Sequence, residues 1–134
     1  MKRYHLDANV ILRFLRNDDP RQSAAAKRFV EAAQTDQVVL ALSAVTIAEV
    51  FYALRTSYKT ARPDAARILG SLLRSSAFEV EHETRVLDAV ERVERLNVDF
   101  GDAYLAATAV EAGETVASFD ADFKKFPDLD WHVP

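Results

Sequence analysis

The amino-acid sequence predicts an α/β protein, a three-layer α/β/α sandwich with a central, mostly parallel sheet. Short apolar segments without strict polar alternation, such as residues 37–42, alternate along the chain with longer segments whose apolar residues have the spacing of a helix. Strands of this kind are buried on both faces, which requires helices on either side of the sheet. No linker or repeat interrupts the sequence, so residues 1–134 are expected to form a single domain.

The strands are predicted from short apolar and β-branched runs. The clearest is residues 37–42, QVVLAL, which is apolar after its first residue. Shorter runs of similar character occur at four further places in the chain. We therefore expect strands, in chain order, at residues 3–6, 37–42, 77–80, 114–118 and 129–133.

The helices are predicted from apolar residues at intervals of three and four, and from residues typical of helix ends. Ser43 is a suitable N-cap, Pro63 suits a first helical position, and Gly113 suits the position just past a helix C-terminus. Residues 83–96 alternate valines with charged residues, which is typical of an amphipathic helix. We expect helices at residues 8–15, 22–33, 44–55, 64–75, 83–96 and 99–112.

Composition excludes several classes of protein. A chain that is 49% hydrophobic and 28% charged is neither disordered nor of low complexity. The absence of cysteine excludes disulfides, thiolate zinc sites and cysteine nucleophiles. The longest uncharged run has 12 residues, whereas a membrane-spanning helix needs about 20. No apolar signal segment precedes Asp7, so the expected location is cytoplasmic, with no membrane partner.

Charge is distributed unevenly along the chain. Residues 1–62 carry 10 basic and 6 acidic side chains, a net charge of +4, whereas residues 63–134 carry 7 basic and 15 acidic side chains, a net charge of −8. This asymmetry predicts two different surfaces. The overall charge of −4 is not typical of a nucleic-acid-binding protein, but Arg13, Arg16 and Arg55 lie in the basic half and are candidates for a local basic patch. Ordinary helix-surface charge explains each of them equally well.

Acidic residues follow the predicted strands at several separate places in the sequence. In an open parallel α/β sheet, functional sites form at the carboxyl ends of the strands, so we expect these carboxylates to meet at one rim of one sheet. Each aspartate alone is also explained as a helix cap or a turn residue, and only their joint placement indicates a site. The acids are Asp7, Glu49, Asp102 and Asp120, with Asp99 close to Asp102.

Glu49 is the most informative of these acids. It lies within an apolar helical segment, where an unpaired carboxylate is costly unless it contacts a cation. The alternative is a buried ion pair with Arg13 or Arg55.

Carboxylates that converge repel one another and need a cation. Ligands that are oxygens alone favour a hard ion, so we expect Mg²⁺, with Mn²⁺ as a substitute. His5, His82 and His132 are far apart in the sequence and show no metal-ligand spacing. A Mg²⁺ ion held by carboxylates usually keeps several water ligands and binds a phosphate of the substrate. Such a site is typical of enzymes that catalyse phosphoryl transfer or hydrolysis.

Four segments that carry these acids resemble, in order, the motifs of the PIN-domain nucleases. The resemblance runs from about residue 4 to residue 126, and within the family the chain is most similar to the compact bacterial form, the VapC-type toxins of type II toxin–antitoxin systems. The segments are DANV at residues 7–10, IAEV at 47–50, DFGDAYLAA at 99–107 and SFDADF at 118–123.

The resemblance implies a Mg²⁺-dependent endoribonuclease that is usually a homodimer and is held inactive by a cognate antitoxin protein. By position, Asp7 and Asp102 would be the principal metal ligands, and Glu49 and Asp120 would complete the acidic pocket. The sequence departs from many relatives at Ala8, where they have threonine. Supporting roles fall to Asn9, Asp99 and Ser118, with Asp122 as an alternative to Asp120.

The implied mechanism is hydrolysis of RNA phosphodiester bonds by metal-activated water, which leaves a 5′-phosphate and a 3′-hydroxyl. Arg13, Arg16 and Arg55 are then candidates for contacts with the RNA backbone. Three alternatives stay open: a PIN nuclease of RNA processing or single-stranded DNA without a toxin role, a non-catalytic PIN scaffold that binds RNA or protein, and a phosphoacceptor receiver domain. The receiver reading is disfavoured because Glu49 lies within a helix and the late lysines follow the last acid.

Overall fold

The predicted apolar segments form strands, and every strand pair is parallel. In the computed structural model, which describes residues 1–134, three strands form one sheet in the order β1-β2-β3, and the remaining two pair with each other in a second sheet. The strands are β1 (Lys2–His5), β2 (Val38–Leu42), β3 (Phe78–Val80), β4 (Thr115–Ala117) and β5 (Asp130–His132).

The predicted α/β class with parallel strands is confirmed, but the five strands do not form one continuous sheet. β1 has no strand neighbour on the side away from β2, and β4 has none on the side away from β5. The expectation that all strands share one rim is therefore wrong for this arrangement. Periodicity in a sequence identifies strands, whereas their pairing depends on contacts between distant parts of the chain.

Most of the helices in the first half of the chain begin at a capping side chain or a proline. The Asp19 carboxylate accepts a hydrogen bond from the backbone N–H of Gln22 at 3.1 Å, and the Ser43 hydroxyl accepts one from Thr46 at 3.2 Å. No helix is both long and apolar enough to cross a bilayer. The helices are α1 (Ala8–Leu15), α2 (Pro20–Gln34), α3 (Ala44–Thr56), α4 (Arg62–Leu73), α5 (Glu83–Leu96), α6 (Phe100–Ala112) and the 3-10 helix η1 (Ala121–Lys125).

A continuous hydrophobic core joins the helices to both sheets. It runs from Leu6, just after β1, to Phe126, just after η1. At its middle, Phe51 of α3 lies against Phe100 of α6, with ring centroids 6.3 Å apart and both side chains almost fully buried. Burial of two such aromatic side chains contributes several kcal/mol and fixes α6 beside α3.

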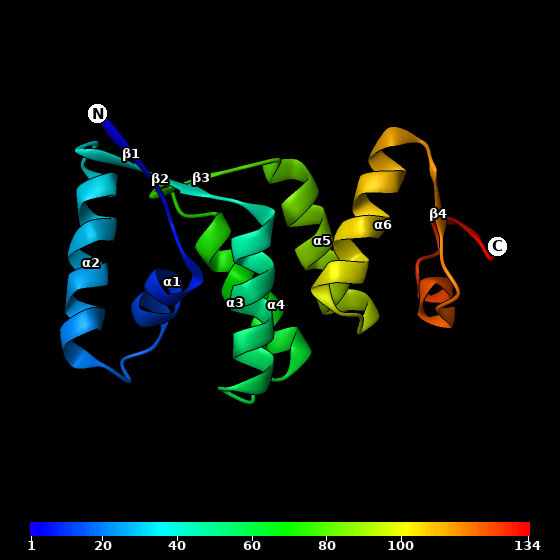
Figure 1. The fold of residues 1–134 in the computed structure, drawn as a ribbon, viewed down its shortest axis with the longest axis horizontal. Coiled ribbons are helices and arrows are strands. Elements are labelled where there is room, and N and C mark those ends of the chain that lie inside the picture. The colour runs from blue at the N-terminus through cyan, green and yellow to red at the C-terminus, as the bar shows by residue number, and fades with distance from the viewer.

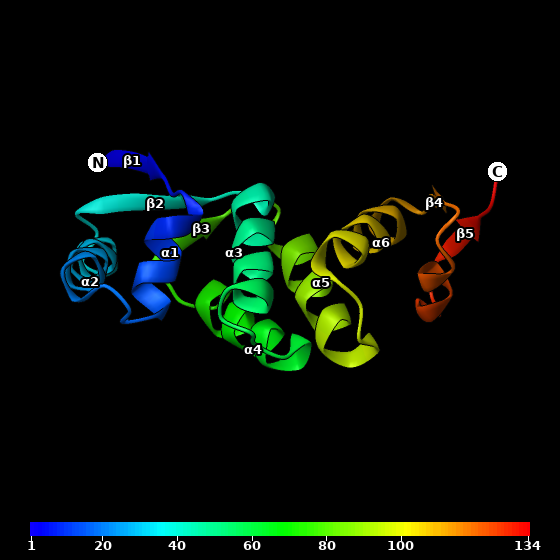
Figure 2. The same cartoon turned by 60° about the horizontal axis from the view of Figure 1, so that its bottom comes forward.

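The elements are arranged roughly in a row (Figures 1 and 2). The β1-β2-β3 sheet with α1 and α2 lies at one end, α3 and α4 occupy the middle, and α5 and α6 follow. In both views the β4-β5 sheet and the C-terminus lie at the opposite end, beyond α6. This end is tied to α5 by buried Arg92, whose guanidinium donates to both carboxylate oxygens of Asp128 at 2.8 and 2.6 Å.

Candidate functional site

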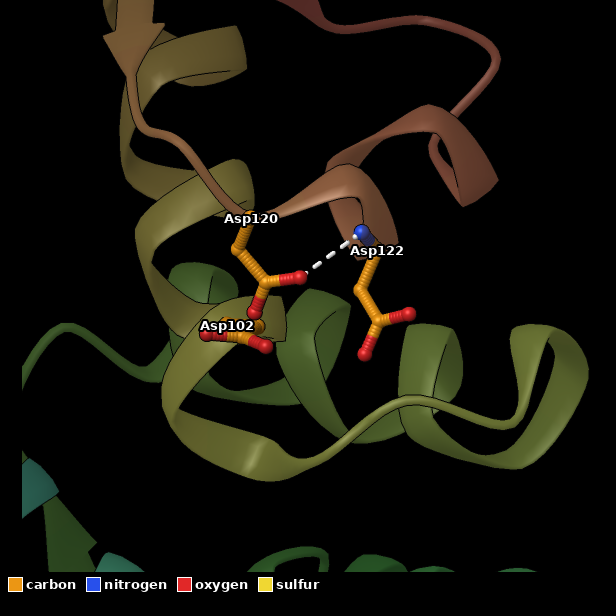
Figure 3. A group of neighbouring side chains, drawn as sticks. All are labelled: Asp102, Asp120 and Asp122. Carbon is orange, nitrogen blue, oxygen red and sulfur yellow. Dashed lines mark hydrogen bonds between the residues drawn. The ribbon is translucent and has the colours of Figure 1, made fainter.

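Three aspartates from the C-terminal part of the chain form an acidic cluster, here called the aspartate cluster (Figure 3). It consists of Asp102, Asp120 and Asp122, each of which offers a carboxylate oxygen within 4.8 Å of the others. Asp102 lies in the first turn of α6, Asp120 follows β4, and Asp122 lies in the first turn of η1. The cluster therefore forms where β4 ends and α6 begins.

Local hydrogen bonds shape the loop that carries two of these side chains. The Ser118 hydroxyl accepts from the backbone N–H of Asp120 at 3.0 Å, and a carboxylate oxygen of Asp120 accepts from the backbone N–H of Asp122 at 2.9 Å. The Ser118 carbonyl in turn accepts from the indole N–H of Trp131 on β5 at 2.9 Å. Ser118 therefore holds the loop that carries Asp120 and does not itself join the cluster.

The electrostatics of the cluster favour a cation. Partial burial raises the pKa of Asp102, and the negative charges of Asp120, Asp99 and Asp122 raise it further. The Lys125 ammonium group lies 3.6 Å from Asp122, in an exposed pair that stabilises the cluster only weakly. A divalent ion among the three carboxylates would relieve their mutual repulsion.

The donor chemistry of the cluster fits Mg²⁺ or Mn²⁺. All three ligand side chains present carboxylate oxygens, and no histidine or cysteine joins them. Hard divalent ions of this kind are bound through a few carboxylates and keep part of their water shell. The predicted metal ligands Asp102 and Asp120 are thus brought together, and Asp122 joins Asp120 rather than replacing it.

Asp99 lies beside the cluster but is engaged elsewhere. Its carboxylate accepts from Arg62 Nε at 2.8 Å, which ties the start of α6 to the start of α4. Its charge still acts on its surroundings, because burial, Asp99 and Asp102 together raise the pKa of the nearby Tyr52 hydroxyl. In this arrangement Asp99 positions α6.

Asp7, Asn9 and Glu49 lie outside the aspartate cluster. Asp7 is the N-cap of α1, and its carboxylate accepts from the backbone N–H of Ala8 at 2.9 Å. The side chains of Asn9 and Glu49 are exposed to solvent. The Thr46 hydroxyl donates to the Leu6 carbonyl at 3.0 Å, which joins the start of α3 to the end of β1. Asp7 and the start of the helix that carries Glu49 are therefore tied to the β1-β2-β3 sheet.

The expectation that Glu49 is a buried carboxylate is wrong. Glu49 is exposed and takes part in none of the ion pairs, so the alternative of a buried pair with Arg13 or Arg55 is also wrong. The spacing of apolar residues correctly predicts that Glu49 lies on a helix. It does not show whether another element covers the face of α3 that carries Glu49.

The three arginines predicted to contact RNA each have a partner within the chain. Arg13 donates to the Gln22 side chain at 2.8 Å, and Arg55 donates to the Thr60 carbonyl at 2.8 Å. The Arg16 guanidinium lies 5.6 Å from the centre of the Tyr58 ring. These contacts hold the arginines in local structure.

Asp122 is the residue that sequence reasoning under-weighted. It lies two residues after Asp120, and its carboxylate reaches the cluster because η1 turns the chain back at this point. The Asp120 carboxylate accepts from the backbone N–H of Asp122, which is an Asx turn. The spacing of two aspartates two residues apart is typical of such a turn, and it was the signal in the sequence that could have placed Asp122 beside Asp120.

The fold and the cluster define the class of protein. The family model of the PIN domain matches residues 4–129, so the chain belongs to the PIN-domain family, as its four motifs predict. Among curated proteins, the chain is similar to a VapC ribonuclease of Aquifex aeolicus (strain VF5). The two sequences are 27% identical over 121 residues, which cover 90% of this chain and 89% of that relative. The predicted resemblance to VapC-type PIN proteins is thereby confirmed.

Proposed function

We propose that this PIN-domain protein is a Mg²⁺-dependent endoribonuclease and the toxin of a toxin–antitoxin pair. The observation that carries the proposal is the aspartate cluster at the end of β4, in a chain that the PIN-domain model matches over residues 4–129. Similarity to a VapC ribonuclease supports RNA as the substrate and a toxin role.

In the proposed mechanism, Asp102, Asp120 and Asp122 would hold the metal ion. When bound, such an ion supplies Lewis acidity toward a phosphate and lowers the pKa of its water. The carboxylates orient it, Ser118 holds the loop that presents Asp120, and Asp7 and Glu49 are proposed to complete the acidic pocket. No side chain of this set donates a nucleophile, so the products should be a 5′-phosphate and a 3′-hydroxyl.

Cleavage of a mixed-sequence RNA by the purified protein tests the proposal. We expect cleavage with Mg²⁺ or Mn²⁺, none with chelator, and at least a hundredfold loss for Asp102→Asn because the metal loses a ligand. Asp36→Asn is a matched control, since it removes one exposed charge at a left-handed position that asparagine also adopts. Products that carry a 2′,3′-cyclic phosphate, or cleavage that persists in chelator, would refute the metal-water mechanism.

The toxin role is tested separately in cells. Induction of the wild-type chain should arrest growth, and induction of Asp102→Asn at the same level should not. Co-expression with an antitoxin encoded beside it should restore growth. Normal growth despite RNA cleavage in vitro would instead favour the alternative of a PIN nuclease in RNA processing.

A further inference from the structure

We infer that two copies of this chain exchange their C-terminal ends, so that β4 of each copy pairs in parallel with β1 of the other. The inference rests on the proposed function only for its activity readout. It gives a five-stranded sheet in the order β3-β2-β1-β4-β5, with the last two strands supplied by the second copy. Each composite sheet then carries one complete set of acids.

The first observation is a pair of open strand edges. β1 pairs with β2 alone, and β4 pairs with β5 alone. Parallel strands are ordinarily covered and paired inside larger sheets, and a two-stranded sheet is marginal by itself. Three of the four residues of β1 are exposed, as are two of the three residues of β4. Both edges present unpaired backbone groups that a further parallel strand would satisfy.

The second observation concerns register. Asp7 lies five residues after Lys2, the first residue of β1, and Asp120 lies five residues after Thr115, the first residue of β4. If Lys2 is level with Thr115, the two acids are also level. Because neighbouring strands lie about 4.8 Å apart, pairing of these two edges brings Asp7 to the aspartate cluster.

A strand of the same chain cannot occupy the free edge of β1 in this arrangement. α3, α5 and α6 lie between β1 and β4 (Figures 1 and 2). Packing of Phe51 against Phe100 and the bond from Arg62 to Asp99 hold α6 beside the middle helices. The pair of Arg92 and Asp128 holds the β4-β5 end on α5. Pairing with a second copy uses only the free edges of β1 and β4, which take part in none of these contacts.

Charge and exposed apolar side chains favour a second copy as the occupant. Residues 114–134, which hold β4 and β5, carry 5 acidic and 2 basic side chains, a net charge of −3, whereas residues 1–42 carry 7 basic and 5 acidic side chains, a net charge of +2, so the exchange brings opposite net charges together. Val45 on α3 is 68% exposed, Leu105 on α6 is 47% exposed, and Phe119 after β4 is 79% exposed. Val45 lies just after β2 and Phe119 just after β4, near the strand ends that the exchange brings together, where docking can remove them from water.

Cross-linking tests the exchange without reference to activity. The chain has no cysteine, so Lys2→Cys and Thr115→Cys can be made as separate single variants, unfolded together, refolded and treated with a short bismaleimide. We expect a covalent dimer of twice 15.0 kDa that contains one chain of each kind. A mixture of Glu31→Cys with Thr115→Cys is the control for random collision, because Glu31 is exposed on α2.

A double variant with both cysteines distinguishes exchange from closure of one chain on itself. Covalent dimers and larger species from the double variant support the exchange. Cross-linking confined to single chains, with no dimer from the mixed single variants, would overturn it. Failure of both samples to cross-link above the Glu31→Cys control would overturn it as well.

Activity then reports on the composite site. Asp7→Asn and Asp102→Asn are each expected to be inactive, but after joint unfolding and refolding they should recover about one quarter of wild-type cleavage. Half of the dimers are then mixed, and each mixed dimer has one intact site. Dimer cross-links with a wild-type protein that cleaves no RNA would refute the nuclease and leave the exchange standing. Cleavage by wild type without recovery in the mixture would refute the exchange.

Discussion

Asp102 shows how one side chain is shaped by its neighbours. It stands in the first turn of α6, partly buried, and faces the charges of Asp120 and Asp122, which together raise its pKa. A carboxylate in such a place is destabilising to the metal-free protein and favourable to a bound cation.

Substitution of this carboxylate should separate metal binding from folding. We expect Asp102→Asn to unfold at the same temperature as wild type, or higher, in chelator, because like-charge repulsion is removed. With Mg²⁺ at tenfold its dissociation constant, wild type should gain about 1.4 kcal/mol and the variant much less. Thermal unfolding with and without Mg²⁺ measures both effects. An equal gain for both proteins would exclude Asp102 as a ligand.

A second residue-scale prediction concerns the pair of Arg92 and Asp128. The guanidinium holds the pKa of the Asp128 carboxyl below its usual value. A depressed folded-state pKa contributes stability above the pKa of the unfolded chain, and this contribution is lost as the pH falls through that value and below. Asp128→Asn should therefore cost about 1 kcal/mol at pH 7, since Asp128 is half exposed and water screens the pair.

Urea unfolding at pH 7 and pH 3 measures the effect of Asp128→Asn, and the gap between wild type and variant should narrow at the lower pH. Asp130→Asn, an exposed neighbour with no ion-pair partner, is the control and should show little difference at either pH. A gap that widens in acid would contradict the assignment.

The residues of the candidate site were predictable to different degrees. Asp102 and Asp120 could be predicted because Asp102 lies near the start of a predicted helix and Asp120 follows a predicted strand. The sequence pattern predicted the helix that carries Glu49. The exposure of Glu49 depends on which elements pack against α3, and a local sequence pattern does not contain that information.

At the scale of elements, the helix starts explain much of the local order. Ser43 caps α3, and the adjacent Thr46 hydroxyl bonds to the end of β1, so a single turn joins helix and sheet. Local signals of this kind are legible in a sequence, which is why the predicted helices and strands lie close to the observed ones. η1 was missed, because a 3-10 helix of five residues is too short to show a period.

The N-cap of α3 gives a prediction at this scale. Ser43→Ala should lower the free energy of unfolding by about 1 kcal/mol, because the backbone N–H of Thr46 loses its acceptor. Ser43→Asn should restore most of the loss, since asparagine caps equally well. Chemical denaturation of the three proteins measures the difference. If Ser43→Ala and Ser43→Asn lower the free energy of unfolding equally, the Ser43 hydroxyl does not stabilise α3 as an N-cap.

At the scale of the whole molecule, the division of the strands into two sheets was beyond prediction from sequence. The positions of the strands and their parallel direction can be predicted from local sequence patterns. These patterns do not show which strand edges pair with each other. The uneven charge of the chain was visible in the sequence, and in the structure its first and last elements, which differ in the sign of their net charge, lie at opposite ends of the molecule.

Association of the two copies should depend on salt. If the acidic β4-β5 end of one chain docks beside β1 at the basic end of another, raising NaCl from 50 to 500 mM should weaken the dimer about tenfold or more. Sedimentation velocity over a range of protein concentrations measures this. Association that strengthens with salt would indicate an interface dominated by apolar contacts.

The open edges of β1 and β4 carry one more consequence. Two copies that exchange ends symmetrically leave neither edge exposed, and growth stops. A copy that donates its end to one neighbour while accepting from another has no such stop, and the chain of donors lengthens into a filament. Concentrated protein refolded quickly should therefore become turbid, whereas slow refolding in dilute solution favours the closed pair.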